Sequence, residues 1–199
     1  VAPHAPDGGR IVLGPAMRAD LILDMTGKPG QRYRVTDSFY RRLEYRLLDL
    51  VYATEPLRAK PLETEVRLPA NPLTEPNVAA AEHHEVLFSG GMMGNMRGMS
   101  RGMAWAINGV SQSEHIHEPL LVLQRNSSHI LRMVNNTAWH HPIHLHGHSF
   151  RVISRNSQPT RHREWLDTVL VAPRETTEIA FVADNPGDWM FHCHILEHQ

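Results

Sequence analysis

The sequence contains a single cysteine, Cys193, so a disulfide bond within the chain is excluded. It carries 20 basic and 21 acidic residues, and a formal net charge of -1 provides no electrostatic case for binding nucleic acid or an anionic membrane. No apolar run approaches the roughly 20 residues that a membrane-spanning helix needs. Histidine, by contrast, is abundant at 15 residues, about half of them in two clusters, and these clusters point to the chemistry of the chain.

The first cluster lies at the end of the sequence, where His192, Cys193 and His194 are followed by His198. Residues 188–191 are typical of the start of a strand, after a turn at 184–187. Because successive side chains of a strand point to opposite faces, Cys193 is expected on one face, with His192 and His194 on the other. One short strand is therefore predicted to serve a thiolate site and an imidazole site back to back.

The second cluster, residues 140–148, reads His-His-Pro-Ile-His-Leu-His-Gly-His. His144 and His146 have the same parity and are expected on one face of an extended backbone, whereas His141 is expected on the other. The two clusters together offer one group of candidate ligands to a thiolate site and another to an all-imidazole site. The thiolate group is Cys193, His141 and His198, and the imidazole group is His144, His146, His192 and His194.

One thiolate, two imidazoles and a weak axial ligand form the ligand set of a blue copper centre. The imidazole group by itself does not name its metal, because imidazole suits zinc, copper, iron and nickel.

The two motifs, His-Pro-Ile-His-Leu-His-Gly and His-Cys-His-Ile-Leu-Glu-His, resemble the paired copper signatures of the multicopper oxidases, the laccase-like enzymes. Asn108-Gly109, Asp167-Thr168-Val169 and Asn185-Pro186-Gly187 also stand where such proteins carry similar residues. The resemblance covers nearly the whole chain and is most specific over residues 104–199.

This resemblance implies a type 1 copper at Cys193 that passes electrons to a trinuclear copper cluster reducing O2 to water. In the family, His144 corresponds to a type 2 copper ligand, and His146, His192 and His194 to ligands of the type 3 pair. The family's cluster needs eight histidines, and this chain supplies four. The others are expected from an N-terminal domain of the same protein, so the chain is expected to be a fragment that is inactive alone.

The resemblance implies a donor that is a phenol, an aromatic amine or Cu(I), meeting the enzyme nearest to His198, and a periplasmic or extracellular location. The axial residue of the family lies beyond Gln199. A glutamine at this position cannot supply protons as an acid would, and Asp167 is expected to support neighbouring ligands only.

Short β-rich runs separated by turns predict an all-β chain. They are Arg10–Leu13, Ala19–Met25, Gln31–Asp37, Glu44–Ala53, His83–Ser89, Ala104–Asn108, Leu120–Gln124, His129–Asn135, Ile143–Ser154, Leu166–Ala172, Thr176–Val182 and Asp188–Cys193. From residue 104 onward this pattern favours a Greek-key β-sandwich or barrel, for which the family implies a cupredoxin-like fold. Residues 1–55 are predicted to end a second cupredoxin-like domain, 56–78 to form a Pro-rich linker and 79–199 to form the copper-binding domain.

Other residues that bind metals elsewhere are expected to lie outside the ligand set. His83 and His84 would face opposite ways on a strand, and His115 and His117 lack the motif context of the other pairs. His148 is expected to support ligands or lie at the surface. The methionines of Met92–Met103 suit Cu(I), but glycines oppose a stable helix there, which favours a loop covering apolar surface.

Three alternatives explain less of the sequence. A zinc hydrolase or a cupin would use His-x-His, but neither accounts for Cys193. A non-enzymatic electron-transfer cupredoxin accounts for Cys193, His141 and His198 but leaves four histidines without a role.

Overall fold

The structure is a computed structural model that describes residues 3–56, 60, 63–64, 66–91, 105–111 and 118–198. The chain divides into two compact units. One comprises Leu13–Arg18 and Ala70–Gln199, and the other comprises Ala2–Val12 and Ala19–Pro69. Within the described residues, no helix has the length and apolar character that crossing a membrane would demand. The domain boundaries expected from the sequence, at residues 55 and 78, stay predictions.

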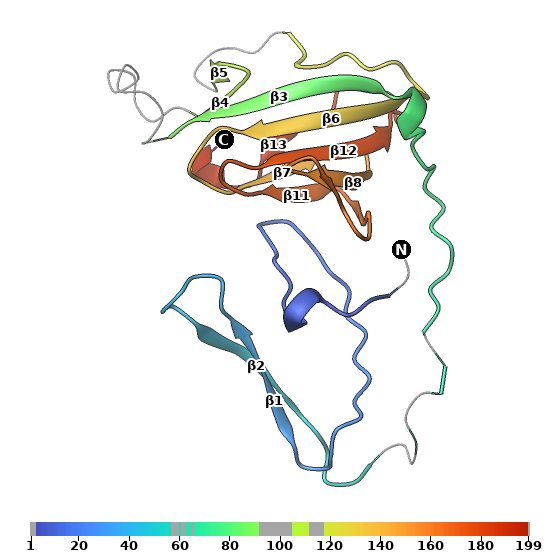
Figure 1. Cartoon of the computed structure of the whole chain (residues 1–199), viewed down its shortest axis with the longest axis vertical. Coiled ribbons are helices and arrows are strands. Elements are labelled where there is room, and N and C mark those ends of the chain that lie inside the picture. Colours follow the sequence, from blue (N-terminus) through green and yellow to red (C-terminus); the bar gives the residue numbers. More distant parts are fainter. Residues whose placement is uncertain are drawn as a thin grey trace. The chain divides into compact units, whose positions relative to one another are not determined.

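The smaller unit contains one antiparallel hairpin of β1 (Arg32–Asp37) and β2 (Tyr45–Val51), preceded by the 3-10 turn η1 (Asp7–Gly9) (Figure 1). Both strands were predicted from the sequence. Across the hairpin, the carboxylate of Asp49 accepts hydrogen bonds from Arg34 at 3.1 Å and from Arg46 at 3.4 Å. The strands predicted over residues 10–13 and 19–25 are wrong. Their apolar side chains are exposed, and β-rich segments become strands only where another strand pairs with their backbone.

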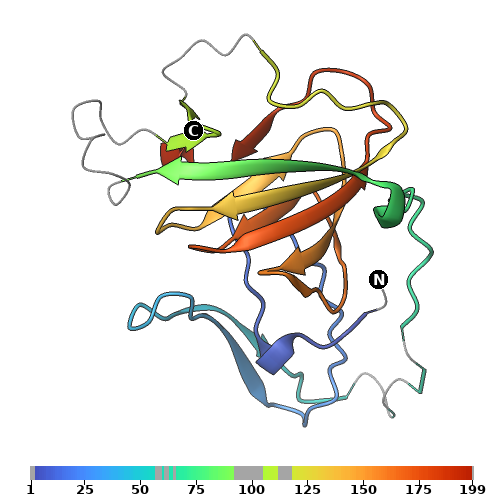
Figure 2. The ribbon, with the colours of Figure 1, turned by 45° about the horizontal axis from the view of Figure 1, so that its top comes forward.

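The larger unit is a sandwich of two sheets (Figures 1 and 2). The larger sheet has the strand order β10-β8-β12-β6-β3-β4-β5, with β9 paired to β8, and the smaller sheet has the order β11-β7-β13. Strands β3 and β6 are parallel, whereas the other neighbours are antiparallel. The strands are β3 (Glu82–Gly90), β4 (Trp105–Ile107), β5 (Val110–Ser111), β6 (Ser128–Asn135), β7 (His141–Leu145), β8 (Phe150–Arg155), β9 (Gln158–Pro159), β10 (Trp165–Leu166), β11 (Thr168–Val171), β12 (Thr176–Val182) and β13 (Phe191–Cys193), with 3-10 turns η2 (Val78–Ala80) and η4 (Leu196–His198).

A hydrophobic core lies between the two sheets, and the period-two pattern of the strands builds it. Buried and partly exposed residues alternate along β8, and β12 buries Ile179 and Phe181 on the same face. Each such side chain contributes about 1.5–3 kcal/mol when it is fully buried. Cys193 belongs to this core, together with Ile143 and Val169 of the small sheet. The prediction of an all-β sandwich is therefore confirmed.

Four predicted strands of this unit need correction. The segment 143–154 is not one strand, because β7 ends at Leu145 and β8 begins at Phe150 in the other sheet. Residues 120–124 form no strand, although Leu121 and Leu123 pack against the core. The segment 166–172 is likewise not one strand, because β10 ends at Leu166 in the large sheet and β11 begins at Thr168 in the small sheet. Residues 188–190 form no strand, since β13 begins at Phe191. The short strands β5 and β9 were not predicted, since two residues are too few to show a periodic pattern.

Gly147 makes the turn between β7 and β8 possible. Its φ of +70° lies in the left-handed region, and a Cβ added there would lie 2.4 Å from Cδ2 of Trp189. The indole nitrogen of Trp189 donates to the carbonyl of Asn185 at 2.9 Å, which holds the ring over the glycine. The turn thus requires glycine for its backbone conformation and for its lack of a side chain.

We predict that Gly147→Ala destabilises the chain more than Gly109→Ala. Gly109→Ala serves as the control, because Gly109 has a φ of +81° but no atom within 4 Å of an added Cβ. This variant should lose only the free energy of placing alanine in a left-handed conformation, about 1 kcal/mol. The clash with Trp189 should add about 1–3 kcal/mol at Gly147. Urea unfolding followed by circular dichroism measures both losses, and equal losses would contradict the packing argument.

Candidate metal centre

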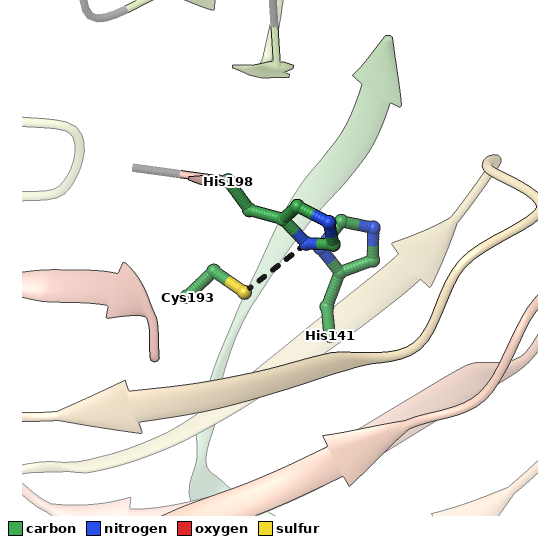
Figure 3. Close-up of side chains that lie close together, drawn as sticks. All are labelled: His141, Cys193 and His198. Atoms are coloured by element: carbon green, nitrogen blue, oxygen red, sulfur yellow. Dashed lines mark hydrogen bonds between the residues drawn. The ribbon is translucent and has the colours of Figure 1, made fainter. Parts of the chain in front are cut away.

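Three side chains converge at one end of the sandwich: His141 from β7, Cys193 from β13 and His198 from η4 (Figure 3). Their donor atoms all lie within 4.8 Å of one another, and Sγ of Cys193 lies 3.6 Å from Nδ1 of His198. His141 and Cys193 are 3% and 6% exposed, whereas His198 is partly exposed. We call these residues the thiolate group. It is the group that the sequence predicted, brought together from two strands and a turn.

The hydroxyl of Thr137 determines which nitrogen His141 presents to the group. Thr137 Oγ1 donates its single hydrogen to Oδ1 of Asn135 at 2.7 Å or to the carbonyl of Trp139 at 3.2 Å. It must therefore accept a hydrogen bond from Nε2 of His141, which lies 2.9 Å away. His141 then carries its proton on Nε2 and keeps the lone pair of Nδ1 for a metal.

Burial controls the protonation of this group. It raises the pKa of the Cys193 thiol to about 11, so binding of a metal ion at neutral pH would displace the thiol proton. Burial, together with the neighbouring His198 and His140, lowers the pKa of His141 to about 4. Burial also lowers the pKa of His198. Both imidazoles are thus neutral at pH 7, which is the form that binds metal.

Trp105 of β4 lies against the thiolate group. Its ring centroid is 4.0 Å from that of His198 and 5.1 Å from that of His141. A Cβ on Gly91, the residue that follows β3, would lie 2.5 Å from Cη2 of this indole. The tryptophan therefore packs directly on backbone and shields the imidazoles from one side. No motif in the sequence indicates this role of Trp105.

The four remaining predicted ligands gather on the opposite face of the small sheet, and we call them the imidazole group. Their ring centroids are 4.4 Å apart for His144 and His146, 5.1 Å for His146 and His192, and 5.4 Å for His192 and His194. In the described part of the chain, they do not form a group of three donors within 4.8 Å, as the thiolate group does. The wider spacing is compatible with ligands shared between more than one ion.

Hydrogen bonds orient this second group as well. Nδ1 of His144 lies 2.8 Å from the carbonyl oxygen of Asp167, which can only accept, so Nδ1 carries the proton and Nε2 is available to a metal. Nδ1 of His192 donates in the same way to the carbonyl of Cys193 at 2.8 Å. Nε2 of His146 lies 3.0 Å from Nε2 of His192, so these donor nitrogens meet.

The pairing of β13 with β7 explains why the groups lie back to back. Cys193 pairs with Ile143 and faces the core, whereas His192 pairs with His144 and faces outward. Strand β11 pairs with the other edge of β7 and places Thr168 opposite His144. Because side chains alternate along a strand, this register separates the sulfur ligand from the outward imidazoles.

Asp167 lies beside the imidazole group. Its carboxylate accepts two hydrogen bonds from Arg18, at 3.0 and 2.6 Å, and one from Thr168. Burial would raise the pKa of Asp167, but these hydrogen bonds outweigh it and the pKa is lowered. With His144 and His148, the aspartate lines a cavity of about 280 Å³. The supporting role expected of Asp167 from the sequence stays a prediction.

The remaining sequence predictions fall in different places. His148 is partly buried, and its Nδ1 donates to the backbone carbonyl of His146 at 3.1 Å. His83 is exposed, whereas His84 lies beside His129 in a separate cluster. His115, His117, Gln199 and the Met92–Met103 stretch lie outside the described residues.

The fold and the site combine a β-sandwich with a Cys-His-His group of which the cysteine and one histidine are buried. Residues 85–199 match the family model of multicopper oxidases, and this match spans more than half of the chain. The chain therefore belongs to the multicopper oxidase family, whose metal is copper, and its sandwich is cupredoxin-like, as predicted. Neutral imidazoles and one thiolate are donors that copper accepts.

The chain is similar to the multicopper oxidase MmcO of Mycobacterium tuberculosis, with 41% identity over 95 residues, which is 48% of this chain and 18% of that protein. It is 39% identical to L-ascorbate oxidase of Cucurbita pepo over 101 residues, 46% of this chain and 18% of the oxidase. Among solved structures, the multi-copper oxidase of Pseudomonas thermotolerans matches with a TM-score of 0.60 and 32% identity, over 86% of this chain and 38% of that one. The chain thus matches well under half of the length of each relative.

We predict that Thr137→Val weakens copper binding by the thiolate group about 10–100-fold, because His141 loses the acceptor that fixes its tautomer. Thr137→Ser keeps the hydroxyl and serves as the matched control. Thr168→Val, which removes a hydroxyl 3.0 Å from Nδ1 of His144, should leave the thiolate group unaffected. Titration with copper, followed by visible absorption, measures the three variants. Equal affinities for Thr137→Val and Thr137→Ser would contradict the assignment.

Proposed function

We propose that the chain provides the type 1 copper ligands and half of the trinuclear-cluster ligands of a laccase-like multicopper oxidase. In this proposal Cys193, His141 and His198 hold the type 1 copper. His144 serves the type 2 copper, and His146, His192 and His194 serve the type 3 pair. The overall reaction removes one electron from each of four donor molecules and combines the electrons with O2 and four protons to give two waters.

The observation that carries this proposal is the connection between the two ligand groups. Cys193 and His192 are joined by a peptide bond, and Nδ1 of His192 also donates to the carbonyl of Cys193 at 2.8 Å. The register of β13 against β7 sends the two side chains to opposite faces. A ligand pair that is covalently linked, hydrogen-bonded and divided between two faces is suited to connect two redox centres.

When bound, copper would supply the one-electron redox chemistry, and the protein residues supply position and protection. Thr137 and the carbonyl of Asp167 orient the imidazoles, and Trp105 shields His141 and His198. Asp167, ionised and fixed by Arg18, holds a negative charge beside the imidazole group, with Oδ1 3.9 Å from Nδ1 of His144. This charge favours cations at the site.

The donor is proposed to be a phenol, an aromatic amine or Cu(I). His198 is partly exposed, whereas His141 is buried, so electrons are proposed to enter beside His198. The relatives include an L-ascorbate oxidase and an iron transport multicopper oxidase, so donors differ within the family. We further propose that the remaining cluster ligands come from N-terminal domains of the same protein, and that it acts in the periplasm or outside the cell.

A plain electron-transfer cupredoxin would use the thiolate group alone. The hydrogen bonds that orient His144 and His192 argue against this alternative, because outward histidines without a metal to bind need no fixed tautomer.

We predict that Cys193→Ser abolishes the intense blue absorption of the copper-loaded chain while the sandwich stays folded. Serine is nearly isosteric with cysteine but lacks the soft thiolate sulfur. Visible absorption after copper loading tests the prediction, and circular dichroism checks the fold. A variant that kept the intense band would refute a copper–thiolate site at Cys193.

We also predict that the 199-residue chain, loaded with copper and given a phenolic donor, does not reduce O2 to water with the stoichiometry of four donors per O2. The imidazole group supplies four of the eight histidines expected of the family's cluster, and a partial set of ligands should hold copper loosely. Oxygen uptake and donor oxidation are measured together. Turnover by the monomeric chain would show that a complete cluster forms without other domains.

A further inference from the structure

A second cluster of potential ligands lies toward the other end of the large sheet. Glu82 and His84 are on β3, His129 is on the neighbouring β6, and their donor atoms all lie within 4.8 Å of one another. The thiolate group is distant, because Phe88 of β3 contacts His141, and four residues of strand separate it from His84 by about 13 Å. This cluster is therefore separate from the copper ligands proposed above.

Hydrogen bonding determines which nitrogen His129 presents. Ser127 Oγ donates its hydrogen to the carbonyl of Gln124 at 2.5 Å, so it must accept from Nε2 of His129 at 2.8 Å. The same carbonyl lies 3.4 Å from Nε2 and can also only accept. His129, fully buried at 0% exposure, thus carries its proton on Nε2 and directs the lone pair of Nδ1 toward His84. A second ring nitrogen bonded to a hydroxyl or carbonyl is typical of metal-ligating histidines.

The distances within the cluster fit a small metal ion. Nε2 of His84 lies 3.1 Å from Nδ1 of His129, and the Glu82 carboxylate oxygens lie 3.8 Å from each of these nitrogens. Ligands at about 2.0–2.1 Å in tetrahedral geometry are separated by about 3.4 Å. Small side-chain rotations therefore suffice to place an ion between the three donors.

We propose that Glu82, His84 and His129 form a binding site for a divalent transition-metal ion of the zinc type, with the fourth position open to solvent. Two neutral imidazoles and one carboxylate are donors that zinc accepts. The carboxylate is 61% exposed, so the ion has a path of entry, while the buried His129 provides a fixed anchor. Burial lowers the pKa of His84, which favours its neutral, metal-binding form.

The experiment is calorimetric titration of the chain with Zn(II), compared between neighbouring histidines. His84→Gln removes a proposed ligand, whereas His83→Gln changes the adjacent, exposed histidine. Both variants keep the thiolate group and the imidazole group, so zinc bound there contributes equally to the two titrations. We expect His84→Gln to lose one zinc equivalent and His83→Gln to keep it. Equal stoichiometry and affinity in the two variants would overturn the proposal and leave the cluster as a hydrogen-bonded histidine pair.

A second pair of variants tests the site even if His84→Gln does not fold. Glu82→Gln changes an exposed carboxylate, and Glu85→Gln on the same strand changes one that pairs with Arg132 instead. We expect Glu82→Gln to bind the ion at least about tenfold more weakly and Glu85→Gln to bind as the unmodified chain does. Zinc should also raise the melting temperature of the unmodified chain through this site. The same rise in Glu82→Gln as in Glu85→Gln would count against the site even if His84→Gln does not fold.

Discussion

The register between β7 and β13 is the constraint on which the proposed centre depends. Cys193 lies opposite Ile143 in the core, and His192 lies opposite His144 on the outer face. A slip of one residue would turn every side chain of β13 to the other face, moving the thiol outward and an imidazole into the core. Burial of the cysteine among apolar side chains therefore stabilises the same arrangement that separates the two ligand groups.

Around three of the histidines, a side-chain hydroxyl or a backbone carbonyl accepts a hydrogen bond from one ring nitrogen. Thr137 accepts from His141, Ser127 accepts from His129, and the carbonyl of Asp167 accepts from His144. In each case one ring nitrogen is held by the protein and the other is left with its lone pair. The nitrogen presented differs, being Nδ1 for His141 and His129 but Nε2 for His144, because the acceptor lies on a different side of each ring.

Sequence reasoning identified the two ligand groups because they depend on alternation along short strands, which a pattern of residues shows directly. It erred where an isolated segment had strand composition but no pairing partner, as at residues 10–13 and 19–25. It also joined β7 and β8 into one strand, although the apolar alternation changes parity across Gly147, from Ile143 and Leu145 to Phe150 and Val152. The contact of His84 with His129 could not be predicted, since nothing in the sequence near residue 84 indicates that β6 lies alongside β3 in parallel.

The sequence alone determined the ligand types, their order and their division between two faces, since the peptide backbone dictates where neighbouring side chains point. Only the tertiary structure decided which distant residues meet them. Thr137, Trp105 and Arg18 reach the two groups from separate elements, and His129 reaches His84 through a parallel pairing. Contacts of this kind arise from the packing of two sheets around one core, and packing depends on every strand at once rather than on any local pattern.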